Sequence, residues 1–185
     1  MHYYTKLKTT VHTTNNEMKI ALSTDHAGYK QLFELKSFLE AHGHETVMYG
    51  PKALVEDDDY PDFMFPAALS VASHECEVGI IFGGSGQGEA MAANRVKGVR
   101  CAVFYGPVAP LAEIDADGGT SQDPYEILKL SRKHNHANML SLAGRFLNKE
   151  QIQHAVLTWL YTPFSTEERH KRRVDKLDTM VQKDN

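Results

Sequence analysis

The chain has 185 residues, 42% of them hydrophobic and 24% charged, and its formal net charge is −4 at pH 7. This length and composition predict one globular domain, and the negative charge argues against a nucleic-acid-binding protein. No apolar run approaches the roughly 18 residues that a membrane-spanning helix needs, so we expect no membrane partner.

The two cysteines and the polar N-terminal segment carry little chemistry. Cys76 and Cys101 lack metal-binding spacing and are interpreted as packing residues of a protein in the reducing cytoplasm. Residues 1–17 are polar and contain no apolar segment like that of a signal peptide. We therefore expect residues 1–17 to form an extension before a single domain at 18–185.

In chain order, short apolar segments alternate with segments of helical periodicity. Segments of strand length lie at residues 19–23, 46–48, 78–82, 100–104 and 139–142. Between them, Leu32, Leu35 and Leu39 recur at helical spacing, and Gly43 is expected to end that helix. The next predicted helix covers 62–73, with Pro66 in its first turn or at a kink. Residues 88–94 are predicted to start a further helix.

A long connection separates the fourth strand from the next helix. Residues 106–122 are rich in Pro, Gly and Asp and predict an inserted loop, longer than most connections in a compact domain. Asp123, Pro124 and Glu126 then have the spacing of an N-cap, a first-turn proline and an N3 acid, for a helix that ends near Lys133.

Two more helices complete the chain. An apolar stripe over 152–160 predicts a helix that ends at Pro163. Ser165 and Glu168 form a capping-box pattern, which predicts a last helix over 165–183. Strands alternating with helices predict an α/β fold, a parallel sheet covered on both faces, with its ligand beyond the carboxyl ends of the strands.

The most informative segment is Ile80–Asn94, which passes from a strand through a loop with four glycines in six residues into a helix. Glycines let backbone N–H groups approach an anion closely, and the following helix start favours negative charge. The loop lacks the lysine and Ser/Thr ending of a nucleotide-binding P-loop. Glu89 stands beside it, and Ser85 within it, so the segment predicts a base next to an oxyanion cradle.

Asp25 and Glu89 each have a structural explanation as well as a functional one. Asp25 and His26 follow the first strand, where they can assist proton transfer or contact phosphate, or Asp25 can simply cap the next helix. Glu89 is favoured at a helix start in any case, which lowers its pKa, whereas burial beside Phe82 would raise it.

Basic and imidazole side chains in the C-terminal half are further candidates. His134 and Asn135 end a predicted helix, where a histidine often serves only as a cap, and His136 has no assigned role. Arginine provides forked donors for phosphate, and the chain offers Arg145, Arg169 and Arg173 for it. The arginines on the last helix could equally form a solvated face or a salt-dependent nucleic-acid contact, which the net charge argues against.

Several motifs together resemble one family. STDHAGYK, DYPDF, GGSGQGEAMAANRVKGVRCAVF, SRKHN, ANMLSL and TPFSTEERHKRRV occur in the order typical of type B ribose-5-phosphate isomerases and galactose-6-phosphate isomerases. The resemblance spans most of residues 18–177, apart from the 106–122 loop. It implies a Rossmann-like three-layer α/β/α fold with a five-stranded parallel sheet, and a cytoplasmic homodimer, with a tetramer as the alternative, whose active sites are shared between subunits.

The resemblance also implies a metal-free, cofactor-free aldose–ketose isomerisation of a small sugar phosphate. Glu89 matches the catalytic base of one branch, whereas another branch has a cysteine at the Gly83 position. Asp25 and His134 would help to open the sugar ring. The remaining implied contacts are Ser85, Asn135 and the amides of Gly84, Gly86 and Gly88 for the enediolate, Tyr60 for the sugar, and Arg145, Arg169, Arg173 and His26 for the phosphate.

Some features depart from the family pattern. His136 replaces the usual aspartate, and both the 106–122 loop and the 1–17 extension are additions. The expected reaction interconverts ribose 5-phosphate and ribulose 5-phosphate. The alternatives are isomerisation of a six-carbon phosphate such as allose or galactose 6-phosphate, and a non-catalytic sugar-phosphate-binding protein.

Overall fold

The computed structural model describes residues 17–180, and its centre is a five-stranded parallel sheet in the order β2-β1-β3-β5-β4. The strands are β1 (Lys19–Thr24), β2 (Glu45–Met48), β3 (Val78–Gly83), β4 (Cys101–Phe104) and β5 (Met139–Ala143). All five match predicted strands to within two residues at each end. The predicted parallel α/β architecture is confirmed.

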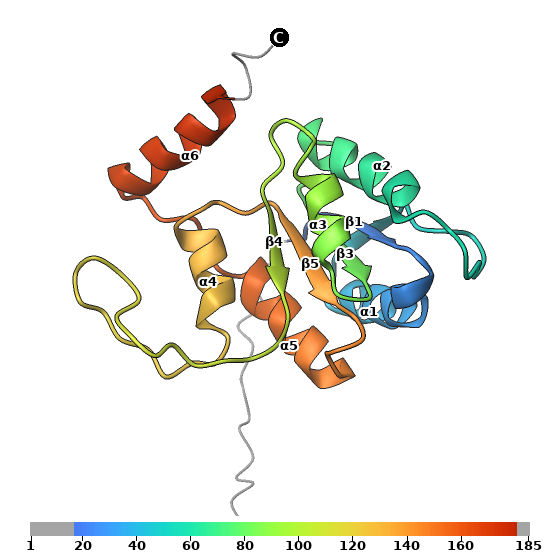
Figure 1. The fold of residues 1–185 in the computed structure, drawn as a ribbon, viewed down its shortest axis with the longest axis horizontal. Coiled ribbons are helices and arrows are strands. Elements are labelled where there is room, and N and C mark those ends of the chain that lie inside the picture. The colour runs from blue at the N-terminus through green and yellow to red at the C-terminus, as the bar shows by residue number, and fades with distance from the viewer. Residues whose placement is uncertain (1–16, 181–185) are drawn as a thin grey trace, which may run out of the picture.

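Helices cover both faces of this sheet (Figure 1). They are the short 3₁₀ helix η1 (His26–Gly28) and α1 (Tyr29–Ala41), α2 (Tyr60–Ala72), α3 (Gln87–Ala93), α4 (Glu126–Lys133), α5 (Lys149–Leu160) and α6 (Glu168–Met180). Helices α2 and α3 contact each other and one face, while α1 contacts the other face together with α5, against which α4 packs.

Each face has its own hydrophobic core. On the α1 and α5 side, Phe82, Phe104 and Trp159 are almost completely buried. On the α2 and α3 side, the core is made of smaller side chains, including Met64 and Ile81. The three central strands, β1, β3 and β5, are almost entirely buried because helices cover both of their faces, whereas the edge strands β2 and β4 are partly exposed. The sheet is therefore a rigid support for the loops at its carboxyl edge.

The chain reverses its direction of travel across the sheet between β1 and β3. From β1 the chain passes to β2 on one side, whereas β3 leads to β5 and β4 on the other. Loops that leave two adjacent strands in opposite directions open a crevice between them, and ligands of α/β proteins bind there. The segments after Thr24 and Gly83 border this crevice.

Two predicted helix caps were wrong, and the structure narrows the prediction for Pro66. Helix α4 begins at Glu126, and the Asp123 carboxylate accepts the Tyr125 N–H at 2.9 Å, so Asp123 caps a turn before the helix. Pro66 lies in the interior of α2 and Pro61 lies in the first turn, so the structure excludes the first of the two predicted placements of Pro66.

The helix α6 also starts later than expected. Ser165 accepts the backbone N–H of Glu167 at 3.2 Å, and α6 begins at Glu168, so the pair does not form the predicted capping box. Residues 181–183 of the predicted last helix, and 1–16 of the predicted extension, lie outside the described residues. Within 17–180, no helix is long and apolar enough to cross a membrane.

Candidate active site

The glycine loop folds the Glu89 side chain back onto the end of β3. Gly86 takes a left-handed conformation, with φ of 76°, that starts α3 and turns it toward the sheet. Glu89 lies in the first turn of α3 and is 5% exposed. A Cβ placed on Gly83 would lie 1.9 Å from the Glu89 carboxyl carbon, and its three nearest atoms would all belong to that carboxyl group. Only glycine at position 83 leaves room for it.

The sequence left open whether the helix start lowers the pKa of Glu89 or burial raises it, and the surroundings of Glu89 decide between the two. Burial raises the pKa of Glu89 above its ordinary value, and the negative charge of Asp25 adds to this effect. A backbone hydrogen bond and the positive charge of His26 act in the opposite direction without reversing it. A carboxyl group with a raised pKa is a stronger base, as proton abstraction requires.

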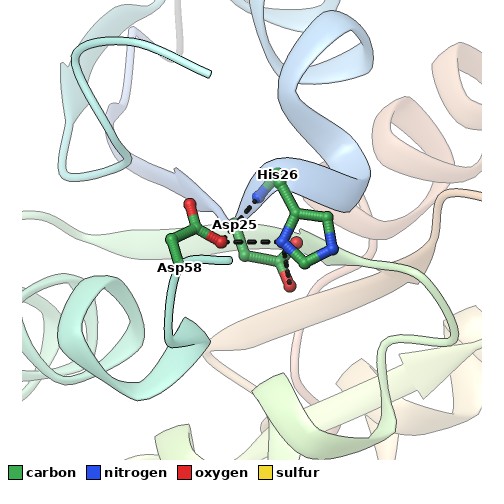
Figure 2. Close-up of side chains that lie close together, drawn as sticks. All are labelled: Asp25, His26 and Asp58. Atoms are coloured by element: carbon green, nitrogen blue, oxygen red, sulfur yellow. Dashed lines mark hydrogen bonds and ion pairs between the residues drawn. The ribbon is translucent and has the colours of Figure 1, made fainter. Parts of the chain in front are cut away.

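Asp25 and His26 follow β1 and lie against the β2–α2 loop. Asp25 Oδ1 accepts the Ala27 N–H at 2.9 Å, so this residue does cap η1. The His26 ring lies between two carboxylates, with Nδ1 2.7 Å from Asp58 Oδ1 and 3.9 Å from Asp25 Oδ2 (Figure 2). Asp25 itself is 6% exposed and lies at the cavity wall.

Asp58 is a part of this site that sequence reasoning missed. It stands in an acidic run, Glu56–Asp59, and only its position just before the DYPDF motif hinted at a role. In the part of the chain that the structure describes, Asp25, His26 and Asp58 are the one group whose atoms could hold a metal ion, within 4.8 Å of one another. The 2.7 Å contact has the length of a charge-assisted hydrogen bond, which needs no ion.

Around these residues lies an open cavity of about 480 Å³ at the carboxyl edge of the sheet. Its walls are formed by Asp25, His26, Ala27, Tyr60, Gly84, Ser85, Gly88, Glu89, Arg145 and Phe146. Arg145 reaches it because the β3–β5 pairing continues past the strands, with the Arg145 N–H donating to the Gly84 carbonyl at 3.2 Å. The Tyr60 ring packs over Gly88, where a Cβ would lie 2.9 Å from the ring.

The other predicted site residues lie near the opposite, amino edge of the sheet. His134 ends α4 and precedes β5, and the Lys133 carbonyl accepts the Ser165 N–H just before α6. At its other end, α6 is tied to the residue before β4 by the Arg100–Asp178 ion pair at 3.3 Å. Figure 1 shows α6 beyond the amino ends of β4 and β5.

The surroundings of these residues differ from those of Glu89. The His134 ring packs against the His170 ring at a tilt of 33°, with ring centroids 4.2 Å apart, and burial lowers the pKa of His134. Asn135 lines a separate cavity of about 400 Å³ between the α3–β4 loop and α6. Arg169 is held by Glu167 at 2.7 Å and by Asp117 at 3.0 Å, while Arg173 is exposed.

Two histidines near this edge also have defined surroundings. His170, which sequence reasoning missed, is 2% exposed on α6 and packs against the His134 ring. His136, which had no assigned role, takes a left-handed backbone conformation with φ of 48° and stacks on Phe164. Neither residue is near the glycine loop.

The structure thus divides the predicted site residues of the chain into two groups. One group lines the cavity beside the glycine loop: Asp25, His26, Tyr60, Gly84, Ser85, Gly88, Glu89 and Arg145. Gly86 belongs to the same loop and lies against Ser141 and Leu142 of β5. The other group, at the amino edge, comprises His134, Asn135, Arg169 and Arg173.

Comparisons with known proteins agree with this architecture. The model of the Ribose/Galactose Isomerase family matches residues 20–111 and 119–177. Ribose-5-phosphate isomerase B of Mycobacterium tuberculosis (strain H37Rv) is 33% identical over 160 residues, which are 86% of this chain and 88% of that protein. The gap in the family match, 112–118, lies inside the 106–122 loop.

Solved structures of similar proteins share the fold. Ribose-5-phosphate isomerase B of Clostridium thermocellum has a TM-score of 0.77 and 34% identity, covering 91% of this chain and 100% of that one. The Mycoplasma genitalium enzyme, solved with bound ribulose-5-phosphate, has a TM-score of 0.75 and 30% identity over 89% of this chain and 97% of that one. The Rossmann-like fold expected from the resemblance is confirmed.

Proposed function

This chain belongs to the ribose/galactose isomerase family, whose members are aldose–ketose isomerases, and we propose that it interconverts ribose 5-phosphate and ribulose 5-phosphate. The observation that carries this proposal is the buried Glu89 carboxyl group, packed against Gly83 at the wall of an open cavity. The similar enzyme solved with ribulose-5-phosphate supports the substrate class.

In the proposed mechanism Glu89 removes the proton from C2 of the open-chain aldose and returns it to C1, through a cis-enediolate. An unaided carboxylate is too weak a base for such a carbon acid, so the developing oxyanion needs stabilisation. Ser85 and the amides of Gly84, Gly86 and Gly88 are the donors we assign to it. Loss of one such donor typically reduces kcat by about 100- to 1000-fold. The chemistry uses proton transfer alone and calls on no metal or organic cofactor.

Gly83 supports the choice of Glu89 as the base. The carboxyl group fills the space where any side chain at position 83 would begin. In the resembling branch that carries a cysteine at this position, the residue at the Glu89 position is apolar. A cysteine at 83 and a glutamate at 89 would occupy the same volume, so we assign this chain to the glutamate-using branch.

The remaining site residues are assigned by the same reasoning. Asp25, buried at the cavity wall, and His134, with its pKa lowered by burial, are proposed to open the sugar ring. Tyr60 would line the sugar and Asn135 would donate to the enediolate. The phosphate would be bound by His26, Arg145, Arg169 and Arg173.

We further propose a homodimer in which each active site takes its second group of residues from the partner subunit. One group lies near the carboxyl ends of the strands and the other near their amino ends, so one chain does not bring them together. This separation supports a site shared between two subunits. Strand β4 pairs with β5 alone among the described strands, and Met91 and Tyr105 beside it are 64% and 52% exposed. Exposed apolar residues along an edge strand are typical of a subunit interface. A tetramer built from such dimers is the alternative.

The direct test is steady-state kinetics with five- and six-carbon sugar phosphates, together with the Glu89→Gln variant. We expect a preference for ribose 5-phosphate, and a kcat about 100- to 10,000-fold lower for Glu89→Gln with KM little changed. Unchanged turnover in this variant would exclude Glu89 as the base. Binding without turnover in the parent protein would instead indicate a sugar-phosphate-binding protein.

A six-carbon substrate is the second candidate, and the 106–122 loop favours it. Asp117 of this loop contacts Arg169, so the insertion reaches a residue that we assign to the phosphate. A substrate of different length would need a different distance between the phosphate and Glu89. A strong preference for allose or galactose 6-phosphate in the same kinetics would replace the first proposal by this one.

A further inference from the structure

His26 is held by a carboxylate from a different segment of the chain. Asp58 Oδ1 lies 2.7 Å from His26 Nδ1 and also accepts the His26 backbone N–H at 3.2 Å (Figure 2). One oxygen atom therefore fixes both the backbone and the ring of His26. Asp58 lies in the loop between β2 and α2, 32 residues along the chain, so the contact depends on the tertiary fold.

We propose that Asp58 is a positioning residue that holds His26 as a doubly protonated donor, with Nε2–H directed at the phosphate of the substrate. The proposal rests on the isomerase function proposed above. Nδ1 is engaged by Asp58, so Nε2 is the ring nitrogen left to face the cavity that His26 lines. An imidazolium next to a carboxylate keeps its charge and has a defined orientation, both of which favour phosphate binding.

The charges around His26 favour its protonated form. The hydrogen bond to Asp58 raises the pKa of His26, and the negative charge of Asp25 contributes in the same direction. Partial burial and the positive charge of Arg145 oppose this effect, and Glu89 also interacts with the ring. Because the His26 side chain is 31% exposed, water screens these interactions, and a moderate shift is expected.

The burial of the Asp58 side chain does not by itself stabilise the fold. Its side chain is 8% exposed, and its Oδ2 atom is buried with no hydrogen-bond partner among the described residues. A buried carboxylate oxygen without a partner is unfavourable. The neighbouring acids Glu56, Asp57 and Asp59 are exposed, so of the four acids in this run only the one that contacts His26 has a buried side chain.

The test compares Asp58→Asn with Asp57→Asn, a matched change at an exposed position in the same loop. NMR titration of the His26 ring should show a lower midpoint in Asp58→Asn and an unchanged one in Asp57→Asn. For Asp58→Asn we expect KM for ribose 5-phosphate to rise about 5- to 10-fold with kcat changed less than about 2-fold. The conservative Asp58→Glu variant should restore the titration midpoint in part.

Inorganic phosphate provides a readout that does not depend on turnover. Phosphate should shift the His26 ring resonances of the parent protein, and about 5- to 10-fold more phosphate should be needed in Asp58→Asn. This arm stays informative if the parent protein isomerises no sugar phosphate at all. An unchanged His26 midpoint in Asp58→Asn would overturn the proposal. So would a midpoint that changes when the parent protein is treated with EDTA, which would assign the three residues to a metal site.

Discussion

The Arg169 guanidinium donates to Asp117 Oδ2 at 3.0 Å, and this contact joins the start of α6 to the 106–122 loop. Inside the loop, Asp115 Oδ1 accepts the backbone N–H groups of Asp117 and Gly119, both at 2.9 Å, which holds Asp117 in place. The loop therefore supplies a carboxylate to an arginine that we assign to the substrate phosphate. Asp117 occupies a donor that the proposed phosphate contact would need.

We expect Asp117→Asn to lower KM for ribose 5-phosphate. The ion pair is exposed on the Asp117 side, so its removal should lower KM by about 2- to 5-fold, with kcat unchanged. Glu113→Gln, an exposed acid in the same loop, is the control and should have no effect. A higher KM in Asp117→Asn would show instead that Asp117 orients Arg169 for binding.

Gly83→Ala should displace the Glu89 carboxyl group and abolish most of the activity. The new Cβ would meet that carboxyl at 1.9 Å, so we expect kcat to fall at least about 100-fold and stability to fall by about 1–3 kcal/mol. Gly106→Ala is the matched control, because no atom lies within 4 Å of a Cβ at that position. Stability should be measured by denaturant unfolding and activity by steady-state kinetics.

The same substitution in a Glu89→Ala background tests the steric reason. With the carboxyl group gone, Gly83→Ala should cost much less stability, because all three of its nearest clashing atoms are removed. The coupling between the two changes, obtained from a double-mutant cycle, should exceed about 0.5 kcal/mol. If the effects of the two substitutions on stability were additive, the alanine at position 83 would not clash with the Glu89 carboxyl group.

The acidity of Glu89 predicts how stability depends on pH. Burial raises the pKa of Glu89, so the folded protein binds this proton more tightly than the unfolded chain does. Ionisation of Glu89 therefore destabilises the fold as the pH rises from the unfolded-state pKa through the higher folded-state value. We expect Glu89→Gln to raise Tm relative to the parent protein by more at about pH 8 than at about pH 4.

Thermal unfolding at the two pH values checks this expectation, and Glu56→Gln, at an exposed position, is the control. The parent protein should also lose kcat/KM as the pH falls through the Glu89 pKa, since the protonated acid is no base. If the Tm difference between Glu89→Gln and the parent were the same at both pH values, Glu89 would not titrate with a raised pKa.

A shared active site predicts complementation between inactive variants. Co-expressed Glu89→Gln and His134→Ala subunits should form mixed dimers that contain one intact site, which restores about a quarter of the parent activity in a random mixture. A mixture of Glu89→Gln with Ser85→Ala should stay inactive, because both changes lie in the same group of residues. Sites contained within one subunit would leave both mixtures inactive.

Much of the fold could be predicted from the sequence because its signals are local. The apolar strands, the leucines of α1 and the terminating Gly43, with φ of 85°, follow from periodicity and backbone sterics. Helix starts were less predictable, since several polar residues compete to cap the same end. Asn148 and Gln151 form the capping box of α5, a pattern that sequence reasoning missed.

For the site, the sequence by itself determined the residue types: the glycine loop, Glu89 beside it, and the arginines for an anion. The tertiary structure decided what each one contacts. It placed Glu89 in the volume that only Gly83 leaves open, brought Asp58 to His26, and set His134 near the opposite edge of the sheet. Residue chemistry is local, whereas burial, ion pairing and pKa depend on segments that meet only when the chain folds.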